Sequence, residues 1–424
     1  MARNITAKKL ATEEIKLKNG ATLLYTPIAT APRLAFSMFL PGGNLLDKVP
    51  GMSDMVDRLL MKGTTTRSQE QIAIEIDGLT LEMDTDTKRD YSGIHATMLE
   101  EDLDTSFDLI ADLFYNTTFS EFEREKQKVA GEVMMDLDSP KSRASDQFIR
   151  RVFENTPYGT VGSVIHDALP RMNSLDDIKA HYQGVFHPKN LIVSVAGNIP
   201  AEQVARVIER SFPADAGGPA QISPAVEAAL RGLTFSKDDT VKFARDDSSQ
   251  AHIYKGWLAP NAKADDYQAL SLLNTILGAA GLSSRLFLEL RDKQGLAYNV
   301  RSTYESYRHQ GLFYLYIGTE PKNKEKCLKG FIEEVDKLIN IPVAEAELAD
   351  AKRNILGRRS VFLETAHQQA NYIGANYTLG RTLEDIAQIP ERIEAITAAD
   401  IQRVAQKYLT QPAITSVVGP SKIL

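Results

Sequence analysis

The feature that most constrains this chain of 424 residues is an internal repeat. Asp177-Ile178, followed by an apolar run that ends in Gly197, recurs as Asp400-Ile401 and a run that ends in Gly419. The separations are 223 residues at the aspartates and 222 at the glycines, so the copies differ there by one gap. Two tandem copies of one α+β unit are therefore the most economical architecture. The segments 33–40, 52–61 and 79–99 correspond to 251–258, 267–277 and 300–318.

Strand and helix signals alternate within each copy. The pattern predicts an α+β fold with two tandem homologous domains, each a mostly antiparallel sheet covered by helices. Pro213 to Pro224, rich in Pro, Gly and Ala, is the clearest linker. We divide the chain into domains 1–212 and 237–424 and a linker, 213–236. In the first copy we expect strands over 22–25, 33–40, 79–83, 91–99 and 191–198, and helices over 52–61, 69–76, 103–114, 121–137 and 201–212.

Composition narrows the classes of function. With 43% hydrophobic and 25% charged residues, the chain is typical of a globular protein with sizeable cores. Its net charge of −7 is spread along the sequence without a Lys/Arg-rich block, so we expect no nucleic-acid partner. No apolar run approaches the roughly 18 residues of a membrane span, so we expect no membrane partner.

Cys327 is the only cysteine, which excludes an intramolecular disulfide and fits a reducing compartment. We therefore expect a cytoplasmic protein. Lys326, next to this cysteine, could lower the pKa of its thiol. A stray thiol is nevertheless the favoured interpretation, because no base lies near Cys327 in the sequence.

The stretch from Gly278 to Tyr298 is the candidate for chemistry. It predicts a small-residue loop, a short helix over 283–291 with Gly295 in a left-handed position after it, and then a strand. Arg291 would lie in the last helical turn and Tyr298 would open the strand, so two strong donors could converge on one carbonyl or carboxylate. The structural alternative is also open, because Arg at a helix end faces the negative end of the helix dipole and Tyr packs well in strands.

Other chemistries lack their motifs. Among the seven histidines no pair has the i, i+4 spacing of a local zinc site on a helix. The sequence has no G-x-S-x-G nucleophile elbow, and the loop 278–281 lacks the Lys-Ser/Thr of a phosphate-binding loop.

The run from Gly51 to Thr64, GMSDMVDRLLMKGT, resembles a motif of the pitrilysin-type inverzincin zinc peptidases, which are related to mitochondrial processing peptidase. Active members carry G-x-x-H-x-x-E-H-x-x-x-x-G-T on a helix. The two-copy architecture, TPYG at 156–159, the Y-x-x-x-x-H-P-x-N-L stretch from Tyr182, and SSRL with LRDKQGLAY in the second copy are similar to the family as well. The resemblance covers essentially the whole chain and implies that it forms half of a clam-shell chamber.

The departures from this motif fall on the zinc site. Where the family has two zinc-binding histidines and a glutamate base, this chain has Asp54, Asp57 and Arg58. Glu132 matches the family's third ligand. Since a guanidinium cannot ligate a metal, the resemblance implies a degenerate site with no metal, and no cofactor in this chain. We expect Asp54 and Arg58, four residues apart, to form an ion pair worth roughly 0.2–0.5 kcal/mol, which Glu132 could join.

Several bacterial members of the family resemble the mitochondrial enzyme in working as two-chain complexes. One chain holds zinc, and the other has lost the zinc motif but keeps an Arg…Tyr pair that Arg291 and Tyr298 match. The resemblance implies a homologous partner with an intact His-x-x-Glu-His motif and zinc, at which Tyr298 donates to the scissile carbonyl and Arg291 binds the substrate backbone. The substrate is a peptide that adds a strand to a sheet edge. Gly278, Gly281 and Ser284 are expected to bind it, although the loop could equally be a plain turn.

Three functions fit these observations. The first, which we predict, is the non-zinc subunit of a heterodimeric zinc metallopeptidase, inactive alone. The alternative is a structural subunit that contributes surface and no chemistry, as the core subunits of a respiratory complex do. A third is a homodimeric peptidase with another metal set from Asp54, Asp57 and Glu132.

Overall fold

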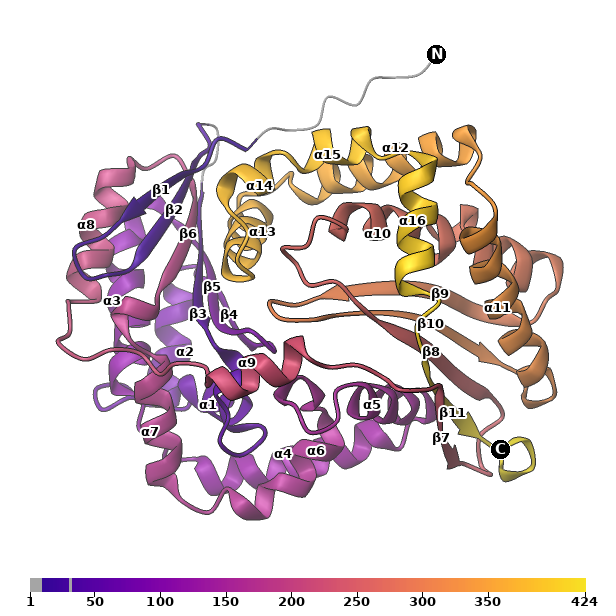
Figure 1. Cartoon of the computed structure of the whole chain (residues 1–424). Coiled ribbons are helices and arrows are strands. Elements are labelled where there is room, and N and C mark those ends of the chain that lie inside the picture. Colours follow the sequence, from indigo (N-terminus) through magenta and orange to yellow (C-terminus); the bar gives the residue numbers. More distant parts are fainter. Residues whose placement is uncertain (1–9, 30–32) are drawn as a thin grey trace.

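A computed structural model describes residues 10–29 and 33–424 of the chain. The N-terminal half is built on a six-stranded sheet (Figure 1). Only the β2–β6 pair is parallel, and the other neighbours are antiparallel. In spatial order the strands are β1 (Glu13–Lys16), β2 (Thr22–Pro27), β6 (Ile192–Gly197), β3 (Arg33–Pro41), β5 (Tyr91–Leu99) and β4 (Glu82–Thr87).

The C-terminal half repeats this sheet with one strand fewer. Again one pair, β7–β11, is parallel and the rest are antiparallel. The edge strands β4 and β9 thus occupy equivalent positions, which confirms the predicted fold of two homologous α+β units. The strands, in spatial order, are β7 (Asp239–Ala244), β11 (Ile414–Gly419), β8 (Ala251–Ala259), β10 (Gly311–Thr319) and β9 (Ala297–Ser306).

One face of each sheet packs on helices of its own half. Apolar residues of α1, α3, α4, α7 and α8 share a core with strand residues such as Leu34 and Phe36. The second core joins α10, α11, α12 and α16 to strand residues such as Ile253 and Phe313. The helices are α1 (Met52–Leu60), α2 (Gln69–Gly78), α3 (Leu103–Asn116), α4 (Phe122–Leu137), α6 (Gly162–Ala168), α7 (Leu175–Val185), α8 (Ala201–Ser211), α10 (Tyr267–Asn274), α11 (Lys324–Asn340), α12 (Glu345–Phe362), α14 (Leu383–Ala387), α15 (Ile389–Ala395) and α16 (Ala398–Tyr408).

The other face of each sheet is covered by a helix from the opposite half. Helix α5 (Pro140–Val152) packs on β8 and β11, and α13 (Ala366–Thr378) packs on β3 and β6. Both contacts need glycine: a Cβ on Gly374 would lie 2.1 Å from the Phe39 ring, and one on Gly256 would lie 2.6 Å from the Phe148 ring. The halves thus exchange these two helices. The proposed division into 1–212, 213–236 and 237–424 divides the sequence, but each domain's sheet is covered on one face by a helix of the other domain.

Three predicted elements differ in the structure. The strand predicted over 79–83 lies at 82–87 instead, because the polar run EMDTDT forms an edge strand with one exposed side. The predicted linker contains a short helix, α9 (Pro224–Arg231), capped by Ser223. The helix predicted over 283–291 is a π-helix at Phe287–Lys293, and a second π-helix, Thr275–Ala279, follows α10. Within the described residues, no helix has the length and apolar character to cross a membrane.

Candidate functional site

The position at which we expect a degenerate zinc site lies between α1 and α4. An ion pair closes it: a guanidinium nitrogen of Arg58 lies 2.8 Å from a carboxylate oxygen of Glu132. Lys128 approaches the other oxygen of Glu132 at 3.7 Å. The prediction of an Asp54–Arg58 ion pair is wrong: among the described residues this pair does not form, and the carboxylate of Asp54 accepts a hydrogen bond from the Asn44 amide at 2.8 Å instead.

Buried carboxylates surround the start of α1. Asn44 donates to Asp54 and also, at 3.3 Å, to Asp47, so one amide bridges two acids. Asp47 further accepts the hydroxyl of Ser53 at 2.6 Å, and that hydroxyl contacts His181 at 2.9 Å. Burial raises the pKa of Asp47 to about 7 and also raises the pKa of Asp54. Burial lowers the pKa of His181 to about 4, so this cluster favours neutral side chains.

Asp57 is the residue that the resemblance aligns with a glutamate base. Burial raises its pKa to about 6; a hydrogen bond to Thr85 opposes this rise, and the negative charge of Asp54 adds to it. Zinc does not fit this site, because Glu132, the one position that keeps the ligand of the zinc-binding motif, is bound to a permanent cation. Across the described residues, moreover, no group of three or more His, Cys, Asp or Glu could hold a metal ion.

The candidate site in the C-terminal half is open. A cavity of about 600 Å³ lies beside the edge strand β9, between the π-helices Thr275–Ala279 and Phe287–Lys293. Both Arg291 and Tyr298 line it, as does the backbone of β9 from Asn299 to Tyr304. The β9 edge is paired on one side only, by β10, so its other side presents free peptide groups to the cavity.

The guanidinium of Arg291 is held between two aromatic rings. Its central carbon lies 4.6 Å from the centre of the Phe287 ring and 4.8 Å from that of the Tyr298 ring. Among the described residues no carboxylate forms an ion pair with Arg291, and Glu289 on the same π-helix is bound to Lys293 at 2.6 Å. Since the rings cover the faces of the guanidinium, its N–H groups stay available to a ligand.

Tyr298 owes its position to a β-bulge. Asn299 pairs with Gly318 and Ala297 with Thr319, so Tyr298 is an extra residue without a partner on β10. Its side chain is 82% exposed. Gly295, just before the strand, has φ +62°, the predicted left-handed conformation. The bulge therefore directs the phenol out of the sheet beside Arg291.

The small-residue loop has mixed roles. Gly278 is buried, and a Cβ there would lie 2.1 Å from the backbone nitrogen of Ser302, so glycine is needed for packing on β9. Gly281 is exposed with φ +74°, and it lines the cavity with Gly278. Ser284 is buried and donates its hydroxyl to the Gly281 carbonyl at 2.7 Å, outside the cavity lining. Of the three, Gly281 is the one that is both exposed and part of the cavity lining.

Sequence reasoning missed two residues of this site. Phe287 precedes Arg291 by four residues, a spacing that signals contact on a helix. Asn274 accepts a hydrogen bond from Ser302 at 2.6 Å and anchors the first π-helix on β9; no short-range signal connects these two. Elsewhere, burial raises the pKa of the Cys327 thiol, which supports the interpretation of this cysteine as a stray thiol.

Two duplicated α+β halves, one with a closed site and the other with an open one, define a bilobal chain of the peptidase type. The chain belongs to peptidase family M16. A family model described as Insulinase (Peptidase family M16) matches residues 33–161, and one described as Peptidase M16 inactive domain matches residues 174–355. The family predicted from the motifs is therefore confirmed.

Relatives with this architecture span several bacteria. The uncharacterized zinc protease YmxG of Bacillus subtilis is 25% identical over 95% of this chain and 97% of its own length. An uncharacterized zinc protease of Streptomyces coelicolor is 29% identical over 88% of this chain and 81% of its own length. An uncharacterized zinc protease of Rickettsia felis is 27% identical over 96% of this chain and 97% of its own length.

Solved structures show the same fold. The crystal structure of a peptidase M16 inactive domain from Pseudomonas fluorescens has a TM-score of 0.87 at 21% identity, over 97% of this chain and 99% of that one. A protease from Helicobacter pylori has a TM-score of 0.86 at 22% identity, over 97% of this chain and 100% of that one.

Proposed function

We propose that this chain is the non-zinc subunit of a heterodimeric zinc metallopeptidase. Its partner is a homologous chain with an intact His-x-x-Glu-His motif, which supplies the zinc. This chain supplies Arg291 and Tyr298 at the partner's catalytic centre and helps to bind the peptide. The observation that carries the proposal is the contrast between the ion pair that closes the first site and the exposed, uncompensated donors of the second.

The proposed roles follow from the chemistry of the two donors. A phenol that donates to the carbonyl oxygen of the scissile bond becomes more effective as negative charge develops on that oxygen. A guanidinium fixed between two rings loses little conformational freedom when its N–H groups bind a peptide carbonyl. Neither role requires a metal in this chain.

The test is reconstitution. Each chain is purified separately, and peptide cleavage is measured for this chain, for the partner and for the mixture. We expect cleavage only in the mixture, and its loss when this chain carries Arg291→Ala or Tyr298→Phe. Full activity of both variants would contradict the roles of these residues, and no activity in any mixture would favour the structural subunit.

Metal analysis of the isolated chain tests the third hypothesis, the homodimeric peptidase. A homodimeric peptidase built on Asp54, Asp57 and Glu132 requires a stoichiometric ion in the isolated chain. We expect none, because Arg58 neutralises Glu132 and because burial disfavours the charged forms of Asp54 and Asp57 that would bind a metal.

A further inference from the structure

The open cavity of the C-terminal half carries charge of one sign only. Its charged lining residues are Arg291 and Arg301, and no carboxylate is among the residues that line it. Each of three other cavities in the described chain is lined by both basic and acidic side chains. The chain as a whole has a net charge of −7, so a purely cationic cavity departs from its composition. Such a cavity favours an anionic ligand.

Arg301 is the cation that the pair of Arg291 and Tyr298 does not use. It is exposed on β9, three residues beyond Tyr298, and no carboxylate of the described chain forms an ion pair with it. On the same face of the strand, the carboxylate of Glu305 accepts the hydroxyl of Tyr314 at 2.9 Å and so faces a phenol instead. The charge of Arg301 is therefore left for a ligand.

A second cation lies close to Arg301. The guanidinium carbon of Arg301 is 5.6 Å from the centre of the Tyr316 ring, and the ammonium nitrogen of Lys141, on α5, is 5.5 Å from the same centre. The phenol does not compensate these cations, because burial raises the pKa of Tyr316 to about 12 and its hydroxyl contacts Nδ1 of His252 at 3.0 Å. Lys141, too, forms no ion pair among the described residues, so the two cations reinforce each other's attraction for an anion.

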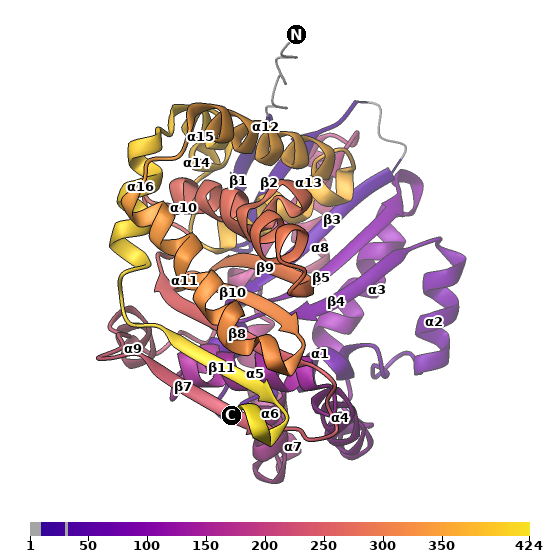
Figure 2. The same cartoon turned by 90° about the vertical axis from the view of Figure 1, so that its right-hand side faces the viewer.

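The two arginines of the cavity lie on different faces of the second sheet. Arg291 belongs to the π-helix Phe287–Lys293, whose Leu290 packs in the core of α10 and α11. Arg301 contacts the ring of Tyr316, which packs in the core of α5. The cavity thus extends around the sheet edge formed by β9, and Figure 2 shows this edge opposite to that of β7. One ligand at this edge meets the two guanidiniums with different groups.

We propose that Arg301 binds an acidic side chain of the peptide substrate, so that the open cavity selects acidic peptides. The inference rests on the proposed function for the presence of a peptide beside Tyr298. Side chains three residues apart on a strand are separated by about 10 Å, and an extended peptide has the same rise per residue. The acidic residue is therefore expected about three positions from the carbonyl that the Tyr298 hydroxyl contacts.

Binding to the isolated, full-length chain tests the inference without the partner. The probes are two fluorescent, amidated peptides of about ten residues that differ only in having two glutamates or two glutamines, and fluorescence anisotropy reports their affinities. We expect the glutamate probe to bind roughly fivefold more tightly. Raising NaCl from about 50 to about 300 mM should remove most of this preference. Non-specific attraction to a chain of net charge −7 would favour the glutamine probe instead.

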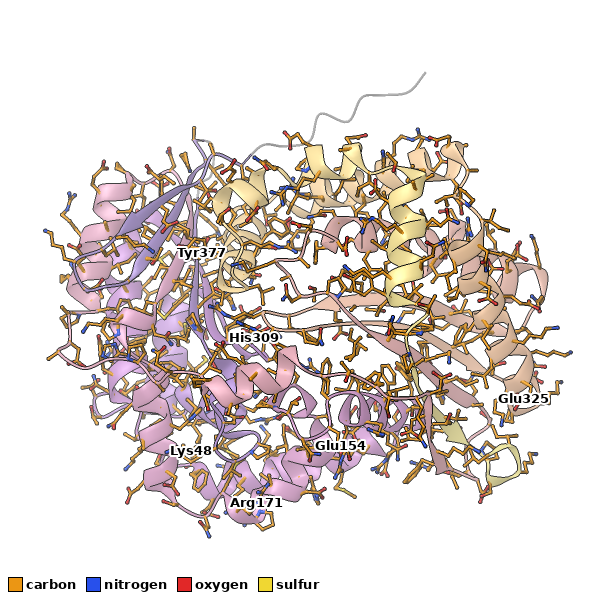
Figure 3. All side chains as sticks on the ribbon, in the orientation of Figure 1. Lys48, Glu154, Arg171, His309, Glu325 and Tyr377 are labelled. Atoms are coloured by element: carbon orange, nitrogen blue, oxygen red, sulfur yellow. The ribbon has the colours of Figure 1, made fainter. Side chains whose placement is uncertain are left out.

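Substitutions assign the preference to one side chain. Arg301→Gln should bind the two probes within twofold of each other and keep the wild-type affinity for the glutamine probe, whereas Arg301→Lys retains the charge and should retain a preference for glutamate. Arg291→Gln should weaken both probes alike, because Arg291 is proposed to bind the backbone. The matched control is Arg171→Gln. Arg171 is also exposed and has no ion pair within the described chain, and Figure 3 labels it at the lower end of the N-terminal half. This control should keep the full preference.

The inference is overturned if the wild-type chain binds neither probe or binds both within twofold of each other, or if Arg301→Gln keeps the preference. A third probe has glutamines and a free C-terminal carboxylate. If it binds more tightly than both amidated probes, the site recognises the end of a peptide, and the assignment to an acidic side chain is wrong.

Cleavage by the mixed complex is measured in parallel, with peptides that carry a single glutamate at successive positions. We expect KM to be lowest when the glutamate lies about three residues from the cleaved bond, and Arg301→Gln to raise that KM roughly fivefold with kcat within twofold. Cleavage without any preference for glutamate would overturn this inference and leave the proposed function standing. A failure of reconstitution with an intact preference in probe binding would overturn the proposed function instead.

Discussion

Each half of this chain has an arginine at its candidate site, and the two arginines are used in opposite ways. In the N-terminal half, Arg58 binds Glu132 at 2.8 Å, so the charge of the guanidinium is neutralised within the chain. In the C-terminal half, Arg291 lies between two aromatic rings and has no ion-pair partner in the described chain. Rings cover the faces of a guanidinium and leave its N–H groups free, whereas a carboxylate occupies them. The first arrangement closes a site and the second prepares one.

The two sites also differ in how far their side chains are buried. The carboxylates near α1 are buried, and burial holds the pKa of Asp47 at about 7 and that of Asp57 at about 6. Tyr298, at the equivalent edge of the other sheet, is 82% exposed on a bulge. The acids Asp47 and Asp57 of the N-terminal site thus belong to a core, whereas Tyr298 of the C-terminal site lies on a surface that another molecule can reach.

The largest expected effect comes from comparing one substitution at the site of each half. In the reconstituted complex, Tyr298→Phe should lower kcat roughly 10²–10³-fold with little change in KM, because the hydroxyl acts only as charge develops on the carbonyl. Arg58→Met should leave kcat within about twofold. Steady-state kinetics of the two complexes checks both. Equal losses from the two variants would remove the proposed contrast between the halves.

The next effect concerns the loop that borders the open cavity. Gly278→Ala should lower the free energy of unfolding by about 3 kcal/mol, because its Cβ would meet the Ser302 nitrogen at 2.1 Å. Gly281→Ala has open space around its Cβ but φ +74°, so its cost should be about 1 kcal/mol. Denaturant titration measures both. A reversed order would show that the close packing of the first π-helix on β9 is wrong.

A smaller effect should be visible in the buried acids of the closed site. Below about pH 4 the folded-state preference for a protonated Asp57 stabilises the protein, and this stability is lost as the pH rises through the folded pKa of about 6. Asp57→Asn should therefore be more stable than wild type by about 1–2 kcal/mol at pH 8, and equal to it near pH 4.

Unfolding curves at several pH values give this difference, and the exposed Asp336→Asn is the matched control. His181, with its pKa lowered to about 4, contributes in the opposite direction in the same range but is common to both proteins. A pH-independent difference between wild type and Asp57→Asn would contradict the raised pKa of the buried Asp57 carboxyl.

The smallest effect is the energy of the closing ion pair itself. The side chains of Arg58 and Glu132 remain 35% and 42% exposed, so solvent screens their attraction. Arg58→Met should cost about 0.5 kcal/mol, close to the cost of Arg124→Met, which breaks a surface pair with Glu121. Denaturant midpoints compare the two. A loss above about 2 kcal/mol would mean that the ion pair supports the core as well as closing the site.

Much of the fold could be predicted from the sequence, because its signals are local or repeated. Helical spacing located α1 and α3, and Gly295 has the left-handed φ that its position predicted. The exchange of α5 and α13 was not predictable, since it depends on contacts between residues more than a hundred positions apart, such as Phe148 and Gly256.

The candidate sites show the same limit. The absence of the zinc motif and the spacing of Arg291 and Tyr298 are visible in the sequence. The choice of Glu132 over Asp54 as the partner of Arg58 is not, because Asn44, from a separate turn, holds Asp54. Likewise, the bulge at Tyr298 arises from the register of β9 on β10, which a pattern of residue types does not encode.

The most direct measurement is a structure of the two-chain complex with a peptide bound to a catalytically impaired partner. The proposal predicts that the Tyr298 hydroxyl lies within hydrogen-bonding distance, about 2.5–3.0 Å, of a carbonyl oxygen of that peptide, with Arg291 on the neighbouring backbone. A complex in which both side chains face solvent or this chain's own interior, away from the partner's catalytic centre, would contradict it.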